Sequence, residues 1–588
     1  MKSLLSTLSG LMYDYIRLEP DVKGLHRDFL TMKARLNREG IGFLTIALPA
    51  FCKSFEKGLE EGLFSCPPGF SRIRGSSLPK FLSGLTERVF NRKTGLLLDI
   101  ADPRMVKIIR EICLMFKKLE LSQKDEDRLD LQAKKKFFDT EEAVLDVFPE
   151  ELSFYIDRVA SLLLPNLDGW ETLDFKHGPG AVFEIGGPNT KWTLLERAIE
   201  ESSDLLLETE FDLEISLKSS LFGAVSSTSS GSEVRLVTVP KSSTARRTIT
   251  VEPCLNQFVQ QGLNNHLRSQ IQKCAILRQC LTLDTQVPNQ WLANLGSITR
   301  EYCTLDLSSA SDLLSDVLVR RIFRKHKRFL SLMEKSRAHK VKGSPLTLKK
   351  YAGMGNATTF PVQSICFAVV CIACILSERR VFPSFKNVVD VSSSSVHVFG
   401  DDIIVKNEYY SQVSTWLERL GLKVNQDKSF SRGFFRESCG LDAYKGVDVT
   451  PLYLRSLPSS SSTPDNIEAI VAFINSSWES GRYYLSMALL SQVERLIKFK
   501  LPLKRKDHGY LGLTNRYDAY DFQKWDRNLH RYMTKSLVTY SPRFSDELDG
   551  YAAFLKFNFT PFIGRGTDHL KKSVRRFNLK HRKRWVHV

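Results

Sequence analysis

Apolar and polar positions alternate along this chain in patterns that predict a helical N-terminal part followed by strands. Residues 1–170 show amphipathic helical periodicity, interrupted by charge-rich stretches such as 119–136. Residues 171–300 carry β-branched runs separated by Ser-rich loops such as 226–232, and 253–268 predicts a helix among them. These patterns predict an α+β protein.

The C-terminal half begins with the order strand, helix, hairpin, helix, strand over residues 301–455. Serines and prolines over 456–464 are typical of a linker, and 466–500 returns to helical periodicity. We therefore expect four regions, with an antiparallel sheet packed on helices in the third: 1–170, 171–300, 301–455 and 456–588.

Two adjacent carboxylates stand at the predicted tip of the hairpin, where Phe399-Gly-Asp-Asp402 lies between two short apolar runs. Asp401 and Asp402 repel each other at a turn, and a divalent cation shared with a third carboxylate would relieve that repulsion. Asp306, at the end of an apolar strand, is the candidate third carboxylate. Taken alone, Gly-Asp-Asp is also typical of an ordinary hairpin turn, and Asp306 of a strand-end cap.

Such a carboxylate set suits nucleotidyl transfer. One cation lowers the pKa of an attacking 3′-hydroxyl and another neutralises the pyrophosphate leaving group, and both need hard oxygen ligands. We expect Asp306 and Asp401 to bridge two Mg²⁺ ions, with Asp402 beside them in support of the metals or the hairpin.

A Gly-rich loop, 353–360, precedes an apolar helix predicted over 362–376. Its glycines, Gly355 among them, allow the backbone to approach a ligand closely. Asn356 can donate to and accept from a ribose 2′-hydroxyl, with Asp312 holding it in place, and this would select ribonucleotides over deoxyribonucleotides. A helix start with Asn and Thr as caps is the other interpretation.

Segment 237–249 places three cations in a predicted loop flanked by two β-branched strands. Lys241 offers a point charge, and Arg246 and Arg247 offer bidentate forks for phosphate oxygens, so the segment predicts a triphosphate clamp. A solvated basic hairpin is the alternative. Lys428 is a candidate general acid for the departure of pyrophosphate, although a lone lysine is weak evidence.

The overall charge favours a polyanionic partner. Among 588 residues, 84 Lys and Arg against 66 Asp and Glu give a net charge of +18, which suits a channel that holds nucleic acid. The last stretch, 569–585, mixes cations with Phe577 and Trp585 and could grip RNA through phosphate contacts and stacking. A disordered solvated tail is the alternative for that stretch.

Cysteine usage and hydropathy favour a cytoplasmic protein. Eleven cysteines lack the spacing of a secreted scaffold, and Cys371 and Cys374 lie inside an apolar run, 365–376, so we expect reduced core cysteines. That run falls short of the roughly 20 residues that a membrane span requires. The N-terminus has a faint signal-peptide character but no clear cleavage site.

Together and in this order, these segments resemble the RNA-directed RNA polymerase (replicase) subunit of the leviviruses, the small positive-strand RNA bacteriophages. The resemblance covers roughly residues 175–455. The residues that carry it are Asp306-Leu-Ser-Ser-Ala-Ser-Asp312, Met354-Gly-Asn356, Gly400-Asp-Asp402, Phe435-Arg-Glu-Ser-Cys-Gly440 and Gly446-Val-Asp-Val-Thr-Pro451, joined by Val237-Thr-Val-Pro-Lys241, Glu252-Pro253 and His177-Gly-Pro-Gly180.

The resemblance implies a right-hand polymerase in which 1–170 braces the fingers, 171–300 forms the fingers, 301–455 the palm, and 456–588 the thumb and tail. It implies copying of single-stranded RNA from ribonucleoside triphosphates, replicating a phage genome with magnesium in the cytoplasm of an infected bacterium. Host elongation factors Tu and Ts and a host ribosomal protein are the implied partners. By position, the implied metal ligands are Asp306 and Asp401 with Asp402 beside them, the ribose selectors are Asp312 and Asn356, and the triphosphate contacts are Lys241, Arg246 and Arg247.

Two positions depart from the family pattern: Gly353 stands where familiar members have Ser, and Pro361-Val-Gln363 replaces an acidic stretch. Neither is an expected metal ligand. A reverse transcriptase is the closest alternative, but its hairpin usually carries another residue where Gly400 stands. The other alternative is a non-catalytic RNA-binding or packaging protein, against which the retained aspartates argue because clustered carboxylates destabilise a fold. Host, template specificity and initiation mode do not follow from the sequence.

Overall fold

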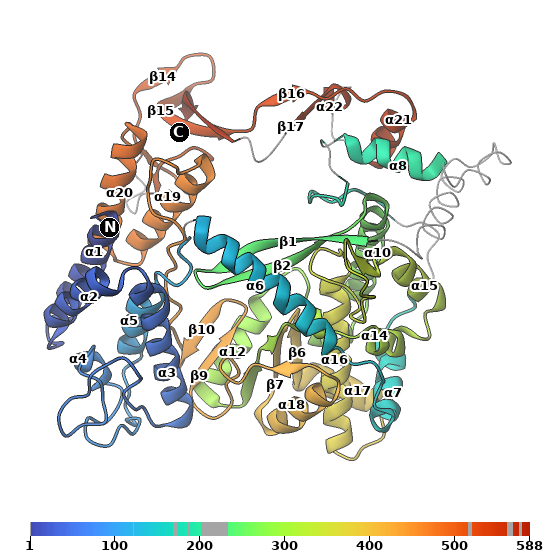
Figure 1. Ribbon diagram of the computed structural model, residues 1–588, viewed down its shortest axis with the longest axis horizontal. Helices are drawn as coiled ribbons and strands as arrows, with labels where there is room; N and C mark the ends of the chain where they lie inside the picture. The colour runs from blue at the N-terminus through green and yellow to red at the C-terminus, as the bar shows by residue number, and fades with distance from the viewer. Residues whose placement is uncertain are drawn as a thin grey trace.

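Helices and small sheets alternate along the chain (Figure 1), which confirms the α+β class. The computed structural model describes residues 2–120, 123–168, 174–184, 187, 189–200, 233–514, 520–560, 568–574 and 579–588. The Ser-rich loop 226–232 and Phe577, which the sequence singled out, lie outside these ranges.

Residues 1–170 are mostly helical where the structure describes them, as their periodicity predicts, although 62–82 and 87–102 form turns and isolated bridges. A further helix, α8 (Thr190–Glu200), follows them. Helix α5 shows why one of these helices begins where it does: Asp102 accepts a hydrogen bond from the backbone N–H of Arg104, and Pro103 occupies the first turn, where no N–H partner is needed. The helices are α1 (Lys2–Leu18), α2 (Leu25–Glu39), α3 (Leu48–Glu61), α4 (Ser83–Thr86), α5 (Pro103–Leu114), α6 (Gln123–Glu142), α7 (Ser153–Leu163) and α8 (Thr190–Glu200).

A long antiparallel hairpin, β1 (Glu233–Ser242) and β2 (Ala245–Val251), crosses the middle of the molecule, and α6 runs over it (Figure 1). Thr248 on β2 donates a hydrogen bond to the carbonyl of Ala133 on α6, and this bond fixes α6 to the hairpin. The short β5 (Lys340–Val341) pairs in parallel with β1, and helices α10 (Cys254–Lys273), α11 (Leu277–Cys280) and α12 (Val287–Thr299) follow the hairpin.

The predicted Gly-Asp-Asp hairpin is confirmed. Strands β6 (Val396–Phe399) and β7 (Asp402–Lys406) pair antiparallel, with Phe399 opposite Asp402, and β3 (Tyr302–Leu305) pairs with the other edge of β7. Gly400 occupies the turn with φ 65°, a left-handed conformation that glycine adopts without strain. Asp306 lies between β3 and the short β4 (Leu307–Ser308), which pairs with β8 (Lys423–Val424).

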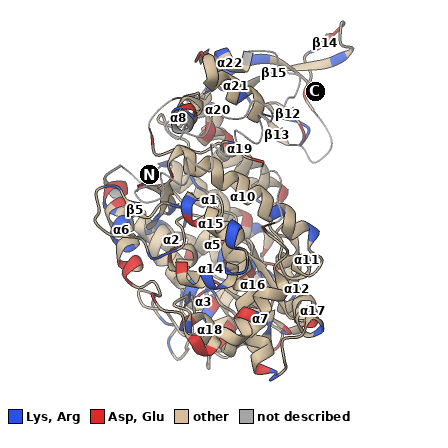
Figure 2. Ribbon diagram, turned by 90° about the vertical axis from the view of Figure 1, so that its right-hand side faces the viewer, with Lys and Arg blue, Asp and Glu red and all other residues tan. Residues whose placement is uncertain are grey.

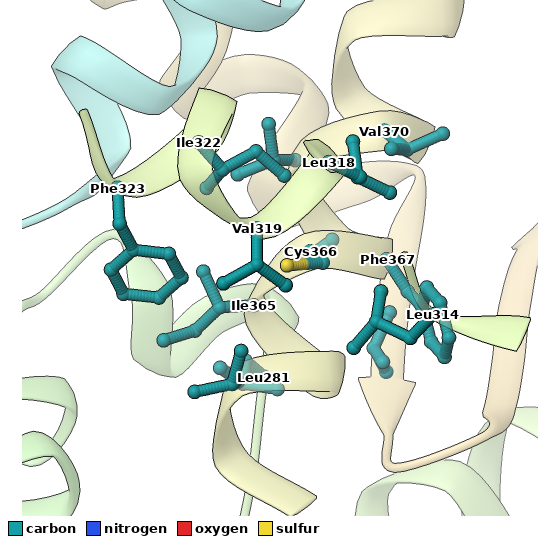
Figure 3. Packing of buried hydrophobic residues seen from close by; sticks show 14 of the residues in the cluster. Leu281, Leu314, Leu318, Val319, Ile322, Phe323, Ile365, Cys366, Phe367 and Val370 are labelled. Atoms are coloured by element: carbon teal, nitrogen blue, oxygen red, sulfur yellow. The ribbon is translucent and has the colours of Figure 1, made fainter. Parts of the chain in front are cut away.

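Helix α16 (Thr359–Glu378) forms the centre of one hydrophobic core. It has 20 residues, so it is longer than the twelve-residue apolar run suggested, because small and polar residues at its N-terminal end are also buried and continue the helix. Its length and mean hydropathy of 2.2 would allow a membrane span, yet 94% of its most apolar 18-residue window is buried inside the protein. Figure 3 shows Ile365, Cys366 and Phe367 of α16 packed against side chains of α14.

Helices surround the three-stranded sheet and α16. Their bounds are α13 (Ala310–Leu313), α14 (Asp316–Phe323), α15 (Lys327–Ser336), α17 (Phe385–Ser394) and α18 (Tyr410–Arg419). Cys371 and Cys374 are buried in α16 as free thiols, as the sequence predicts.

A second hydrophobic core joins the two ends of the chain. Side chains between Leu4 and Leu119 pack with side chains between Phe430 and Leu537. The predicted linker and the helices after it are present, and α1 packs directly on the second of them. The elements on the C-terminal side are β9 (Phe435–Ser438), β10 (Leu441–Tyr444), β11 (Val447–Asp448), α19 (Pro464–Glu479) and α20 (Tyr483–Ile497).

The remaining C-terminal segment passes over the top of the molecule in Figure 1, from α20 to α8. Lys556 there donates a hydrogen bond of 2.6 Å to the side-chain oxygen of Asn189. Residues 580–587 form a strand, so the alternative of a disordered tail is wrong for them. The elements are β12 (Leu503–Lys504), β13 (Leu513–Thr514), β14 (Lys524–Asp526), β15 (Arg531–Tyr540), β16 (Arg543–Ser545), α21 (Gly550–Phe559), α22 (Asp568–Lys571), β17 (Lys572–Val574) and β18 (Lys580–His587).

Candidate active site

One cavity of about 850 Å³ brings together segments that lie far apart in the sequence. Its lining comes from α6, the β1–β2 hairpin, the segment after β3, the Gly-rich loop, the tip of the β6–β7 hairpin and the segment after β8. Nine of the ten site residues that the sequence singled out line it: Lys241, Arg246, Arg247, Asp306, Asp312, Gly355, Asn356, Asp401 and Lys428.

Asp306 is fixed by the segment that follows β8. The Asn425 side chain donates a hydrogen bond of 2.7 Å to its carboxylate, and its backbone N–H donates to the Ser429 hydroxyl. Burial raises the pKa of Asp306, the Lys428 charge opposes that rise, and the Asp401 carboxylate adds to it. A negative charge on Asp306 is therefore costly until a cation approaches it.

Asp402 is the one predicted site residue that does not line the cavity. Asp401 belongs to the turn whereas Asp402 begins β7, and the Asp402 carboxylate accepts a hydrogen bond of 3.5 Å from the Cys439 thiol instead. Burial, followed by repulsion from Asp401, raises its pKa to about 6.

Asp306, Asp401 and Asp402 offer the oxygen ligands that a divalent cation prefers, although the three carboxylates do not surround one point. Within the described ranges, no three His, Cys, Asp or Glu side chains are close enough to share one metal ion. Asp401 nevertheless raises the pKa of both Asp306 and Asp402. Mutual repulsion among oxygen donors is what Mg²⁺ relieves, so these residues fit that ion.

The three cations of the β1–β2 hairpin lie at the end of its strands, next to the turn at Ser243-Thr244. Burial lowers the pKa of Lys241, and repulsion from Arg247 lowers it further. Arg247 has no ion pair within the described part of the chain. Arg246 is already engaged, because it donates hydrogen bonds of 2.7 and 2.9 Å to Thr238. Lys241 and Arg247 are therefore the better placed pair for an anion in the cavity.

The two expected ribose selectors are held by different neighbours. The oxygen of the Asn356 side chain accepts hydrogen bonds from the backbone N–H and the hydroxyl of Thr358, at 2.9 and 2.7 Å. Asp312 instead accepts a 2.9 Å hydrogen bond from the buried Lys350. The Asn356 amide nitrogen is buried, and no described residue accepts a hydrogen bond from it. A cavity-lining donor without a partner points to a ligand acceptor.

The glycines of the Gly-rich loop allow it to pack against β2, a reason that the sequence did not reveal. Gly355 has φ 136°, and a Cβ atom there would lie 1.8 Å from the carbonyl oxygen of Thr250. A Cβ atom on Gly353 would lie 2.4 Å from the Thr250 side chain. The loop is anchored at this point, because the Thr250 N–H donates to the Met354 carbonyl at 2.7 Å.

Lys428 is paired with a carboxylate at the edge of the cavity. Its ammonium group lies 2.7 Å from Glu437. Burial alone would lower the pKa of Lys428, but the Glu437 and Asp306 carboxylates outweigh burial and raise it. A raised pKa makes Lys428 a fixed positive charge and a weaker proton donor than the general-acid hypothesis requires.

Sequence reasoning missed the side of the cavity that α6 forms. This helix lines the cavity with Gln132, Lys136 and Phe137. Lys350 connects α6 to Asp312, because its ammonium group lies 3.2 Å from Glu141 of α6 and also pairs with Asp312. The charge-rich stretch was visible in the sequence, but its contact with β2 is long-range and has no local signal.

The central part of the chain matches known proteins. Residues 222–465 match the family model described as RNA replicase, beta-chain. Over 277 residues the chain is 35% identical to the RNA-directed RNA polymerase subunit beta of Escherichia virus Qbeta, covering 46% of this chain and 42% of that protein. It is 34% identical over 224 residues to the same subunit of Enterobacteria phage SP, covering 38% and 36%. It is 32% identical over 240 residues to the RNA-directed RNA polymerase beta chain of Escherichia phage MS2, covering 40% and 39%.

The matched segment spans less than half the length of these relatives. All the predicted site residues lie within residues 222–465, whereas His177-Gly-Pro-Gly180 lies outside the family match. The resemblance to levivirus replicase subunits that the motifs predicted is confirmed for this segment.

Proposed function

We propose that this chain is an RNA-directed RNA polymerase that copies single-stranded RNA from ribonucleoside triphosphates. The observation that carries the proposal is the cavity, which Asp306 and Asp401 line together with Lys241, Arg247 and Asn356, whose amide nitrogen has no partner among the described residues. All of these side chains belong to the segment that matches replicase β chains.

Each side chain has a task in nucleotidyl transfer. Lys241 and Arg247 bind the oxygens of the triphosphate and offset the charge that develops on it. The Asn356 amide donates to the ribose 2′-hydroxyl, and Lys428 stabilises negative charge near Asp306. Asp306 and Asp401, supported by Asp402, would hold two Mg²⁺ ions, whose chemistry would be to activate the 3′-hydroxyl and to neutralise the leaving pyrophosphate.

The proposal extends to the architecture and surroundings. Fingers would comprise β1, β2 and the elements around them, the palm 301–455, and the thumb α19 and α20. The first 120 residues would then support the thumb side, because they share its core, while α6 and α7 support the fingers and palm. The relatives are named as β subunits, so we propose that this chain works with further subunits, host proteins among them, in the cytoplasm of an infected bacterium.

The test is incorporation of labelled ribonucleotides on a single-stranded RNA template with magnesium. The unmutated chain, Asp306→Asn and Asp401→Asn are compared, each with and without bacterial extract. Both substitutions remove a carboxylate but little basic surface, so we expect them to abolish synthesis and to leave RNA binding within about twofold.

Synthesis by the unmutated chain alone would establish the polymerase, and dependence on extract would show that host subunits are needed. If all three forms bind RNA and none incorporates nucleotides in any condition, the proposal fails in favour of a non-catalytic RNA-binding protein. Parallel loss of RNA binding in Asp401→Asn would contradict the separation between carboxylates and basic surface.

A further inference from the structure

The antiparallel sheet β14–β15–β18 lies at one end of the molecule and outside the segment that matches replicase β chains (Figure 2). Its three strands are rich in cations and poor in acids. The cations are Lys524, Arg531, Lys535, Lys580, Arg582, Lys583 and Arg584, and the acid is Asp526. Asp526 is already engaged, because it accepts hydrogen bonds from two backbone N–H groups and lies 3.9 Å from His587.

One face of this sheet carries aromatic rings at one end and arginines farther along the strands. Trp525 stands directly opposite Tyr532, with ring centroids 4.7 Å apart, and Phe522 lies 4.7 Å from the same tyrosine. These rings are 45%, 41% and 58% exposed, respectively. Side chains alternate between faces along a strand, so Arg582 and Arg584 of β18 lie on this same face, and both are exposed.

The opposite face repeats the combination. Trp585 of β18 stands opposite Lys535, and the ammonium group of Lys524 lies 4.6 Å from the centre of its ring. Trp585 is 42% exposed. Large rings held in water beside positive charges leave apolar faces available for a partner that is itself both flat and anionic.

We propose that this sheet is a binding surface for single-stranded RNA, separate from the cavity. Unpaired bases would stack on Trp525 and Tyr532, and phosphates would lie against Arg582 and Arg584 of the same face. A duplex hides its base faces, so it would gain the phosphate contacts alone. The inference does not depend on catalysis by the chain.

The test is binding of a fluorescein-labelled 20-residue oligouridylate to the full chain, without nucleotides, across a series of salt concentrations. Arg582→Glu/Arg584→Glu should weaken binding at least about tenfold and reduce the slope of log affinity against log salt by about 1.4, since each lost phosphate contact accounts for about 0.7. Trp525→Ala/Tyr532→Ala should weaken binding about tenfold with little change in that slope.

Controls separate this surface from general charge and from folding. Lys33→Glu/Arg74→Glu makes the same change in charge at exposed positions of the N-terminal part and should leave affinity within twofold. Trp525→Phe/Tyr532→Phe keeps the rings and should restore binding. The proposal is overturned if the arginine variant binds RNA as tightly as the Lys33/Arg74 control. It is also overturned if the alanine variant loses as much affinity for a blunt duplex as for the single strand.

The polymerase proposal can fail without affecting this one. A chain that incorporates no nucleotides but loses oligouridylate binding through the arginine variant supports the surface and contradicts the polymerase. If the unmutated chain synthesises RNA and the arginine variant binds oligouridylate as well as the unmutated chain does, the polymerase proposal is supported and the surface proposal is contradicted.

Discussion

At the scale of single residues, Asn356 offers the sharpest link between structure and substrate choice. Its oxygen accepts hydrogen bonds from Thr358, its buried amide nitrogen has no partner among the described residues, and the residue lines the cavity. We predict that Asn356→Ala raises the ratio of deoxyribonucleotide to ribonucleotide incorporation about tenfold, the value of one hydrogen bond of about 1.4 kcal/mol. Gln132→Ala removes another amide from the same cavity and should leave the ratio unchanged. An unaltered ratio in Asn356→Ala would remove this residue from ribose selection.

Glu252 supplies a residue-scale prediction about pH. Burial raises its pKa from an ordinary 4.5 to about 7, against the opposing hydrogen bond from Gln260. The folded state holds the proton more tightly than the unfolded chain, so the neutral form stabilises the fold below about pH 4.5 and this contribution is lost as pH rises through 7. Glu252→Gln keeps the neutral shape. We predict that the unfolding free energy of Glu252→Gln, relative to that of the unmutated chain, rises by about 3 kcal/mol between pH 5 and 8, as measured by urea unfolding. A gap that stays constant with pH would contradict this.

At the scale of elements, the Gly-rich loop depends on its contact with β2. A methyl group on Gly355 would meet the Thr250 carbonyl oxygen, so the loop must move or β2 must yield. We predict that Gly355→Ala costs about 2–4 kcal/mol in unfolding free energy and lowers nucleotide incorporation, because the loop also carries Asn356. Gly343→Ala is the matched control, since Gly343 has φ 77° but no atom within 4 Å of the added methyl, and should cost about 1 kcal/mol. Equal costs at both positions would mean that conformation alone, and not the contact, requires glycine.

Elements defined by local patterns were predictable, and contacts between distant elements were not. The hairpin around Gly400 follows from two short apolar runs and a turn residue, and Asp306 follows from the end of an apolar strand. Nothing local indicates that α6 covers the cavity, because that depends on packing between segments more than 100 residues apart. Nothing local indicates that Lys350 forms an ion pair with Asp312 either, because that depends on which of several partners a side chain contacts. For the same reason the sequence could not show that Asp402 turns toward Cys439.

At the scale of the whole molecule, the N-terminal and C-terminal parts of the chain pack against each other. The first 120 residues pack with the helices after residue 464, and the C-terminal segment reaches α8. The segment that matches replicase β chains therefore does not contain a complete core of its own, because Phe435 of β9 and Tyr444 of β10 belong to the core that side chains between Leu4 and Leu119 form. The stability of the matched segment should depend on residues that lie outside the match.

Arg110 on α5 tests that dependence. It is 2% exposed, forms ion pairs with Glu56 and Asp442, and lies 4.7 Å over the Phe435 ring. We predict that Arg110→Leu costs about 3–5 kcal/mol at pH 8, because it leaves the buried Asp442 and the partly buried Glu56 without their cation. The loss should be smaller at pH 5. Burial already raises the pKa of Asp442 to about 6, and without the arginine this carboxyl takes up a proton more readily still.

A double variant separates loss of the charge pair from loss of packing. Asp442→Asn in the Arg110→Leu background removes one of the stranded charges, so it should recover at least about 1 kcal/mol at pH 8 and nothing at pH 5. Urea unfolding at the two pH values measures both effects. If Arg110→Leu costs the same at pH 5 and pH 8 and Asp442→Asn recovers nothing, the arginine acts through its contact with Phe435 and its hydrogen bond to the Val449 carbonyl. The N-terminal helices would then hold the matched segment by contacts other than the buried ion pair.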